Sequence, residues 1–474
     1  MPHWFPKLAC ACQVRVSPPV DYSIRIGIPP RRCLCGSRRR ENRRNRKDGE
    51  KSKPCREKQE ECDPGTANES ERIGGGIRVG IYEELHVPRV INAAGPVTRY
   101  GGSCLSDRVL QAMEEATRSY VRLDELQLGV GKRLASWTGA EAGYVTTGAA
   151  AGLALGAAAI MAGLDVDRME RLPDTEGIPN EFVIQSCHRC NYDHAIRAAG
   201  AKLVTVDCAE DAEQEDVRAA ISSVKTRRIC GTVYIFRTGD RGVPLETWVA
   251  ASEDMNLPVL VDAAVRLPPV RNLRDIPGTG ADLVVFSGGK AIGGPQGTGF
   301  VVGRRDLIES ILLQNQDMDV NAETWFLCKW IDEGKLAKPS RNGIGRGYKV
   351  SKENIIGLLV ALEEYLERDH AADMVRWHRR IDSIVQGLSG IGACHVEKIS
   401  DPDYSYPVPM ACFRLTEAAE MTLVDFVNAC AALEPPVLFE EGPLKKGYLI
   451  IHPMCLSEED VGVLVDSVRG VLQR

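Results

Sequence analysis

The chain has 474 residues, enough for two or three domains and a large buried core. Its composition is 44% apolar and 26% charged, which is typical of globular proteins, and 16 cysteines in so long a chain do not indicate the disulfide framework of a small secreted domain. Residues 1–80 hold 18 Lys and Arg against 10 Asp and Glu, so a net charge of +8 there leaves −14 for the remainder, which argues against a nucleic-acid-binding surface spread over the whole chain.

Residues 1–79 are dense in charge and have almost no apolar periodicity, as in RRCLCGSRRRENRRNRKDGEK. Such a segment cannot bury enough apolar surface to offset its ordering entropy, so we expect a disordered basic extension. Two C-x-C pairs within it leave a metal-binding or nucleic-acid-binding arm as an alternative. We expect residues 1–78 to be dispensable for the fold, and their composition leaves open that they lie outside the natural protein.

Order is expected from about residue 80 onward. Residues 143–164 read GYVTTGAAAGLALGAAAIMAGL, 22 residues without a charge. Alanine and glycine gain little from entering lipid, and no basic flank orients the segment. We therefore predict a buried helix of small residues packed close on a sheet. No secretory signal pattern opens the chain, and a cytoplasmic protein is expected.

Alternating strands and helices are predicted for the next part of the chain. Runs rich in β-branched residues at 182–186, 203–207, 232–236, 258–262, 282–287 and 299–303 predict strands, and 212–224 and 245–256 are examples of the helices between them. This order is typical of βαβ units, so we predict an α/β fold with a large, mixed, mostly parallel sheet over residues 80–305.

The pattern changes after residue 305. A long helix is predicted over roughly 351–387, followed by the apolar run MACFRL, a helix at 423–432, the apolar run GYLIIHP, and a last helix from Ser457. This order predicts a smaller C-terminal α+β domain over residues 306–474.

One lysine lies among glycines in residues 284–299, VVFSGGKAIGGPQGTG. A nucleotide-binding Walker loop would need glycine where Val284 stands and serine or threonine where Ala291 stands. No strand–G-x-G-x-x-G–helix unit appears elsewhere, so a dinucleotide site has no support. A lysine that bonds covalently to an aldehyde cofactor is the remaining interpretation of Lys290.

Other residues fit the needs of pyridoxal phosphate (PLP). Asp262 ends the apolar strand VLVD, where a carboxylate would keep a pyridine nitrogen protonated. The turn VTTGAAAG opens a helix whose free N–H groups favour a phosphate, and a hydroxyl three residues before the lysine could add to them. Each feature alone has an ordinary alternative: a strand-end aspartate, a helix cap, a solvated lysine. In their chain order they predict a PLP site made of Thr147, Gly148, Ala149, Asp262, Ser287 and Lys290.

The sequence resembles a known family from about residue 80 to its end. The segments are INAAGPVTRYGGS, TGAEAGYVTTGAAAG, YDHAIRAAGAKLV, VDAAVRLPP, FSGGKAIGGPQGTG and IGRGYKVSKE. They resemble the selenium-transferase-like branch of fold-type-I PLP-dependent enzymes, which includes L-seryl-tRNA(Sec) selenium transferase and D-glucosaminate-6-phosphate ammonia-lyase. By this resemblance Lys290 would bind PLP covalently, Asp262 would pair with the ring nitrogen, and Gly148, Ala149 and Ser287 would hold the phosphate.

Three further residues are candidates of a weaker kind. His188 follows a predicted strand, where related enzymes place a ring that stacks on PLP; a surface histidine in a loop is the alternative. It lies inside Cys187-His-Arg-Cys190, but zinc would need a second pair at suitable spacing, so we expect no metal. Arg346, in GIGRGYKV, is favoured as a clamp for a substrate carboxylate or phosphate, and Arg99 is a second candidate for that role.

The expected reaction is an α,β-elimination of the ammonia-lyase type. In it the lysine amine removes the Cα proton of a small 2-amino-3-hydroxy acid, with a phosphorylated amino sugar acid foremost. The tRNA-dependent selenium transferase, a racemase, an aldolase, a transaminase and a non-catalytic binding protein remain alternatives. We expect a homo-oligomer without a membrane partner, and a nucleic-acid partner only under the selenium-transferase alternative.

Overall fold

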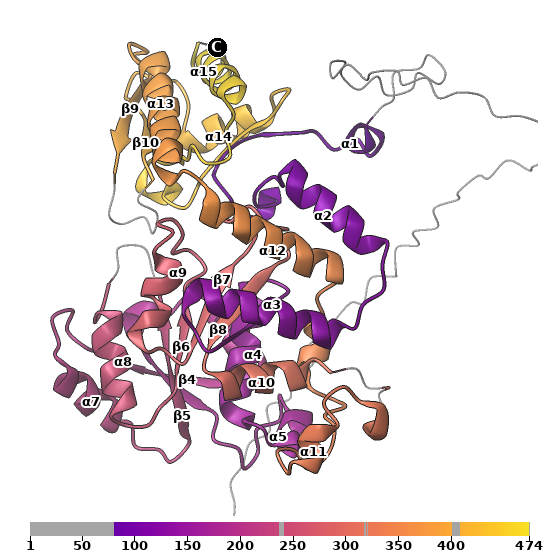
Figure 1. Cartoon of the computed structure of the whole chain (residues 1–474). Helices are drawn as coiled ribbons and strands as arrows, with labels where there is room; N and C mark the ends of the chain where they lie inside the picture. The colour runs from indigo at the N-terminus through magenta and orange to yellow at the C-terminus, as the bar shows by residue number, and fades with distance from the viewer. Residues whose placement is uncertain (1–79, 237–240, 317–318, 320, 401–407, 474) are drawn as a thin grey trace, which may run out of the picture. The chain divides into compact units, whose positions relative to one another are not determined.

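The computed structural model describes residues 80–236, 241–316, 319, 321–400 and 408–473, all of them within one compact unit, Ile77–Arg474. The predictions for residues 1–79 lie outside the described residues. Figure 1 shows the arrangement of the helices and strands.

A seven-stranded sheet forms the centre of the large part of this unit. Its strands lie in the order β2 (Ala142–Thr146), β8 (Gly299–Gly303), β7 (Leu283–Ser287), β6 (Val259–Asp262), β5 (Ile229–Ile235), β3 (Glu181–Gln185) and β4 (Lys202–Val206). β8 runs antiparallel to β2 and β7, and the other neighbours are parallel. The predicted α/β fold with a mixed, mostly parallel sheet is confirmed.

Both faces of this sheet are buried by helices, which is why its strands are nearly continuous apolar runs. In β7, Val284 and Phe286 point into the apolar cluster shared with α3 (Leu123–Thr138), α7 (Gln214–Ser222), α8 (Leu245–Glu253) and α12 (Lys352–Glu367). Leu283 and Val285 point into the cluster shared with α4 (Ala149–Ala162), α5 (Val166–Arg171), α6 (His194–Ala198) and α10 (Arg305–Gln314). In Figure 1, α3 and α12 cross one face and α4 and α10 lie on the other.

The uncharged stretch at 143–164 is a strand followed by a helix. β2 takes its first residues, and α4, buried nearly all round, takes the rest. A Cβ added to Gly152 would lie 2.8 Å from Val285 Cγ1, and one on Gly156 would lie 2.8 Å from Leu260 Cδ1. The small residues therefore let α4 approach the sheet closely, as predicted. Among the described helices, none is long and apolar enough to cross a membrane.

A smaller antiparallel sheet lies in the C-terminal part, in the order β12 (Leu449–Ile451), β10 (Met410–Leu415), β9 (Cys394–Ile399), packed with α13 (His370–Leu388), α14 (Leu423–Ala431) and α15 (Glu458–Leu472). The helix predicted over 351–387 is two helices. The Asp369 side chain accepts a hydrogen bond from the Ala372 N–H at 2.9 Å and so caps the start of α13.

Packing crosses the predicted boundary at residue 305. α10 and α12 contribute to the apolar clusters of the large sheet, and β1 (Ile91–Ala93) pairs in parallel with β11 (Val437–Phe439) beside the C-terminal sheet. The division at 305 stays a prediction. The remaining helices are α1 (Ile81–Glu84), α2 (Asp107–Thr117), α9 (Asn272–Asp275) and α11 (Lys329–Asp332).

Candidate active site

The predicted site residues meet at one edge of the large sheet. β6 and β7 are parallel, and β2 runs in the same direction because both β2 and β7 are antiparallel to β8. Their carboxyl ends therefore share one edge, where parallel sheets of this kind bind ligands. A cavity of about 890 Å³ opens there, and its lining includes Thr147, Gly148, Ala149, Asp262, Ser287 and Lys290.

The turn between β2 and α4 presents the start of a helix to this cavity. Gly148, the residue before α4, has φ +90°, a left-handed conformation that favours glycine, and nothing lies within 4 Å of where its Cβ would be. No side chain of the described residues caps α4, so its first N–H groups suit an anion. The Thr147 hydroxyl donates to the Tyr348 carbonyl at 3.2 Å and holds the turn.

Lys290 is presented by a tight loop after β7. The Gly288 N–H donates to the Thr298 carbonyl at 2.9 Å, and the Lys290 carbonyl accepts from the Ser103 hydroxyl at 2.6 Å. A Cβ on Gly289 would lie 2.5 Å from Gln296 Cα, so the glycines allow the loop to fold against residues 296–298. Burial lowers the pKa of the Lys290 amine, and the nearby Asp262 carboxylate opposes this. A lowered pKa favours the neutral amine, which is the form in which a lysine can act as a nucleophile or a base.

Asp262 is almost fully buried at the end of β6. Its Oδ1 accepts from the Ala264 N–H at 3.0 Å. Burial raises the pKa of this carboxyl, while the Ala264 N–H and the Lys290 charge lower it only in part. Asp262 is therefore a buried acid whose neighbours do not fully stabilise its charge, and a cation brought beside it would do so.

The residues present fit PLP, a group that the structure does not contain. The start of α4, which follows Gly148, lies at the cavity without a capping side chain. Lys290, whose pKa is lowered, and Asp262, whose pKa is raised, also line the cavity. The three match the phosphate, the aldehyde and the pyridine nitrogen of the cofactor. The cofactor roles of these residues remain proposals.

His188 lies next to this cavity but is not among the residues that line it. Its ring is buried and packs edge-on against Tyr234 with 4.4 Å between ring centroids, and its Nε2 lies 2.8 Å from the Arg241 carbonyl oxygen. The surface-loop alternative is wrong, because the ring is buried. Stacking on a cofactor stays a prediction.

The two arginines predicted to bind substrate also lie outside the cavity lining. Arg346 is in the short 3-10 helix Ile344–Tyr348, which the Thr147 hydroxyl joins to the turn before α4. Arg99 pairs with Glu441 at 3.2 Å and donates to the Phe439 carbonyl at 3.1 Å, so it links the segment after β1 to β11. Their roles in substrate binding stay predictions.

Several lining residues were missed by the sequence reasoning. The segment Arg189, Cys190, Asn191 and Tyr192 follows β3, and Thr98 and Gln296 come from two other loops. β3 is parallel to β5 and β6, so its carboxyl end reaches the same edge. That rule predicts residues 189–192 at the site, whereas the CHRC motif by itself indicates only a metal site, a redox pair or a stacking ring. Among the described residues no group of three or more His, Cys, Asp or Glu could hold a metal ion.

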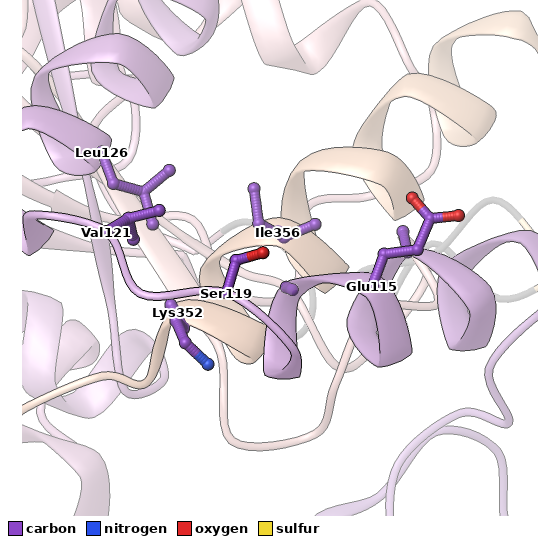
Figure 2. A pocket seen from close by; sticks show the side chains of 8 residues that line it. Glu115, Ser119, Val121, Leu126, Lys352 and Ile356 are labelled. Atoms are coloured by element: carbon purple, nitrogen blue, oxygen red, sulfur yellow. The ribbon is translucent and has the colours of Figure 1, made fainter. Parts of the chain in front are cut away.

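Another cavity, of about 260 Å³, lies between α2, α12 and the start of α3 (Figure 2). Val121, Leu126 and Ile356 line it with aliphatic carbon, and Lys352, which also lines it, pairs with Glu353. It shares no lining residue with the larger cavity, and none of the residues predicted for the PLP site lines it. The chemistry therefore belongs to the larger cavity.

Comparisons with known proteins show which family the chain belongs to. Residues 90–319 match the family described as L-seryl-tRNA selenium transferase. A 5'-C-glycyluridine monooxygenase-decarboxylase of a Streptomyces species is 35% identical over 404 residues, which cover 82% of this chain and 92% of that protein. A D-glucosaminate-6-phosphate ammonia lyase of Salmonella typhimurium is 27% identical over 83% of this chain and 98% of that protein. The solved structure of a D-glucosaminate-6-phosphate ammonia-lyase superposes with a TM-score of 0.68 and 25% identity, covering 84% of this chain and 99% of that one.

Proposed function

This chain belongs to the family of PLP-dependent enzymes that contains L-seryl-tRNA selenium transferase and D-glucosaminate-6-phosphate ammonia lyase, and from that premise we propose that it eliminates the β-hydroxyl of a 2-amino-3-hydroxy acid. The observation that carries the proposal is the common cavity of Lys290, Asp262 and the start of α4. The products are ammonia and a 2-oxo acid.

Each part of the site has one task in this proposal. The N–H groups at Gly148 and Ala149, with the Ser287 hydroxyl, hold the cofactor phosphate. With PLP bound, the Asp262 carboxylate would pair with the ring nitrogen, and Lys290 Nζ would hold the aldehyde carbon. When bound, PLP withdraws electrons from the Cα of an amino acid joined to it, so that a bond at Cα breaks more easily.

Lys290 is the residue that moves the proton. Its Nζ would accept the Cα proton of the substrate, and burial, which lowers its pKa, favours the neutral form that can do so. The hydroxyl on the next carbon would take up a proton and leave as water, and a later water molecule would release ammonia. A protonated ring nitrogen would favour the charged form of the buried Asp262, whose pKa is otherwise raised by burial.

The substrate class follows from the chemistry of the relatives' names. D-Glucosaminate 6-phosphate, a seryl group and 5'-C-glycyluridine each carry an amino group and a hydroxyl on adjacent carbons beside a carboxyl carbon. The cavity, at about 890 Å³, leaves room beyond the cofactor for a large polar substituent. We therefore place the phosphorylated amino sugar acids first among the substrates.

A second candidate is oxidative decarboxylation of a glycyl nucleoside. The 35% identity to a monooxygenase-decarboxylase over most of both chains favours it. It uses the same site but breaks the bond between Cα and the carboxylate and consumes O₂.

One experiment separates the two reactions. The purified, PLP-loaded enzyme is incubated with D-glucosaminate 6-phosphate, D-glucosaminate, L-serine and 5'-C-glycyluridine, and ammonia, 2-oxo acid, CO₂ and O₂ are measured. Ammonia and a 2-oxo acid in equal amounts without O₂ uptake support elimination. CO₂ release with matching O₂ uptake supports the second candidate. If all four compounds give neither pattern, both are wrong.

A further inference from the structure

Lys290 belongs to the loop between β7 and β8, whose residue types do not by themselves impose one shape. The stretch 288–297, GGKAIGGPQG, is rich in glycine. Glycine loses more conformational freedom on folding than any other residue, and a lysine side chain adds a flexible four-carbon stem. The position of the Lys290 amine therefore depends on what fixes the backbone of Lys290.

Hydrogen bonds inside the loop fix it in part. The Gly294 N–H donates to the Gly288 carbonyl at 2.9 Å, and the Gly293 N–H donates to the Lys290 carbonyl at 3.0 Å. Both bonds join residues of the same loop. They shape the loop, but they do not join Lys290 to another segment of the chain.

Ser103, far away in the sequence, supplies such a connection. Its hydroxyl donates to the Lys290 carbonyl at 2.6 Å, and its N–H donates to the Gly289 carbonyl at 3.2 Å. The preceding residue, Gly102, has φ +73°, and a Cβ there would lie 2.4 Å from the Gly289 carbonyl oxygen. The two backbones are thus in direct contact, which glycine at position 102 permits. Ser103 holds two successive carbonyl groups, one of which is that of Lys290.

The segment that carries Ser103 is held from other sides as well. Gln296 Nε2 donates to the Thr98 carbonyl at 2.7 Å, and Cys455 Sγ lies 3.9 Å from the Gly102 carbonyl oxygen. The first contact joins the segment to the loop of Lys290 a second time, and the second joins it to the chain after β12. The Ser103 hydroxyl is therefore a donor in a fixed place.

We propose that Ser103 is a positioning residue, which holds the backbone of Lys290 so that the amine reaches the aldehyde carbon of PLP and the Cα of the substrate. Ser103 is not among the described residues that line the cavity, so it acts through Lys290. The proposal rests on the proposed function for the identity of the substrate, whereas the bond between Lys290 and PLP can be measured without a substrate.

Three variants test this role. Ser103→Ala removes the hydroxyl and leaves the backbone bonds in place, and Ser103→Thr keeps a hydroxyl on the same carbon. Ser310→Ala is the matched control. The Ser310 hydroxyl donates to the Gly163 carbonyl and so joins α10 to the end of α4, and Ser310 does not line the cavity. This control removes a serine-to-carbonyl bond between distant segments, so it shows what a loss of stability alone does.

The first readout is the rate at which PLP bonds to the protein after it has been removed and added back. The cofactor absorbance follows this rate, and borohydride labelling identifies the lysine. We expect Ser103→Ala to lower the rate about five- to tenfold, which corresponds to the loss of one neutral hydrogen bond, and Ser310→Ala to leave it within about twofold of the wild type. Ser103→Thr should restore most of the rate, and melting temperatures record the stability of all three variants.

The second readout is the turnover of the PLP-saturated enzyme on the compound identified by the substrate panel. We expect kcat to fall in Ser103→Ala by about the same five- to tenfold factor, because the amine that moves the proton is less well placed. KM should be unchanged, because Ser103 lies outside the cavity lining. A purely structural role would lower the melting temperature without this fall in kcat.

The two proposals can fail separately. If wild-type protein bonds PLP at Lys290 but converts none of the four compounds, the proposed substrate class is wrong, and the rate of PLP bonding still tests Ser103. Wild-type rates in Ser103→Ala, an equal loss in Ser310→Ala, or a Ser103→Thr variant as slow as Ser103→Ala would overturn the positioning role. PLP bonded to a lysine other than Lys290 would overturn it too.

Discussion

Two buried aspartates near one cavity are treated in opposite ways by their surroundings. Asp193 accepts from two arginines, one on each oxygen, and its pKa is lowered. Asp262 accepts from the Ala264 N–H and is near one lysine whose own pKa is lowered by burial, and the pKa of Asp262 is raised. Both lie at the carboxyl edge of the same sheet.

The difference concerns how far each charge is stabilised by the chain itself. Two arginines donate to Asp193, so this carboxylate contributes to the fold and to the position of Arg189. The charge of Asp262 is stabilised only in part by its neighbours, which is what we expect of the residue proposed to pair with the cofactor. Buried acids with raised pKa values next to a cavity are candidates for function for this reason.

The largest effect is expected from Lys290→Ala, which removes the buried amine near Asp262. We expect a colourless protein that borohydride does not label and whose turnover falls by at least about a thousand-fold, because the nucleophile and the base are both lost. The cofactor absorbance measures the colour, peptide mapping after borohydride reduction measures the labelling, and product assays measure the turnover. Lys352→Ala, in the other cavity, is the control and should stay yellow. Labelling of a different lysine in the wild-type protein contradicts the assignment.

Asp262→Asn removes the carboxylate whose charge the chain stabilises only in part. We expect the variant to keep PLP bound but lose about a hundred-fold or more in turnover, because an amide cannot keep the ring nitrogen protonated. In the wild-type protein without PLP, a raised folded pKa means that stability falls as the pH rises above the unfolded value of about 3.9 toward the folded one. The PLP-free variant should therefore melt above the PLP-free wild type at pH 7, and a lower melting temperature would contradict the comparison.

Asp193→Asn should have the reverse effect on stability. It leaves two half-exposed guanidinium groups without their shared carboxylate, and we expect a loss of about 1 kcal/mol in the free energy of unfolding at pH 7. The lowered folded pKa means that the stabilisation is present above the unfolded value of about 3.9 and is lost as the pH falls through the folded value. Urea denaturation at pH 7 and pH 3 measures it. A loss equal at both values would show that the pair contributes no charge-dependent stability.

His452 is a buried histidine that does not line the cavity, and it shows how burial shifts the pKa of a basic side chain. Burial lowers its pKa to about 4, and its Nδ1 accepts from the Met454 N–H at 3.2 Å. Between pH 4 and 6.5 the unfolded chain binds more protons at this residue, so stability rises with pH in that window. We expect the free energy of unfolding of the wild-type protein to fall by about 2 kcal/mol between pH 7 and pH 5. His452→Gln should not show this fall, and a variant of the exposed His395 should still show it. An unchanged pH slope in His452→Gln would assign the loss to other groups.

Strand positions and the PLP-dependent family were predictable from the sequence, because both depend on local pattern. All six predicted strands are present to within a few residues, since a buried parallel sheet demands continuous β-branched runs. β2 was not predicted, because it shares its uncharged composition with α4. Residues 351–387 form two helices because Asp369 caps the start of the second one, and the spacing of apolar residues does not reveal such a cap.

The sequence by itself determined the α/β class and the set of residues that suit PLP, because residue type and order specify the chemistry of Lys290, Asp262 and the turn at Gly148. Only the tertiary structure decided which side chains share the cavity. His188 and Arg346 were predicted to belong to the site but do not line the cavity, whereas Arg189 does. The reason is physical: strand direction carries residues far apart in sequence to one edge, while the burial and partners of each charge exist only once the chain has packed.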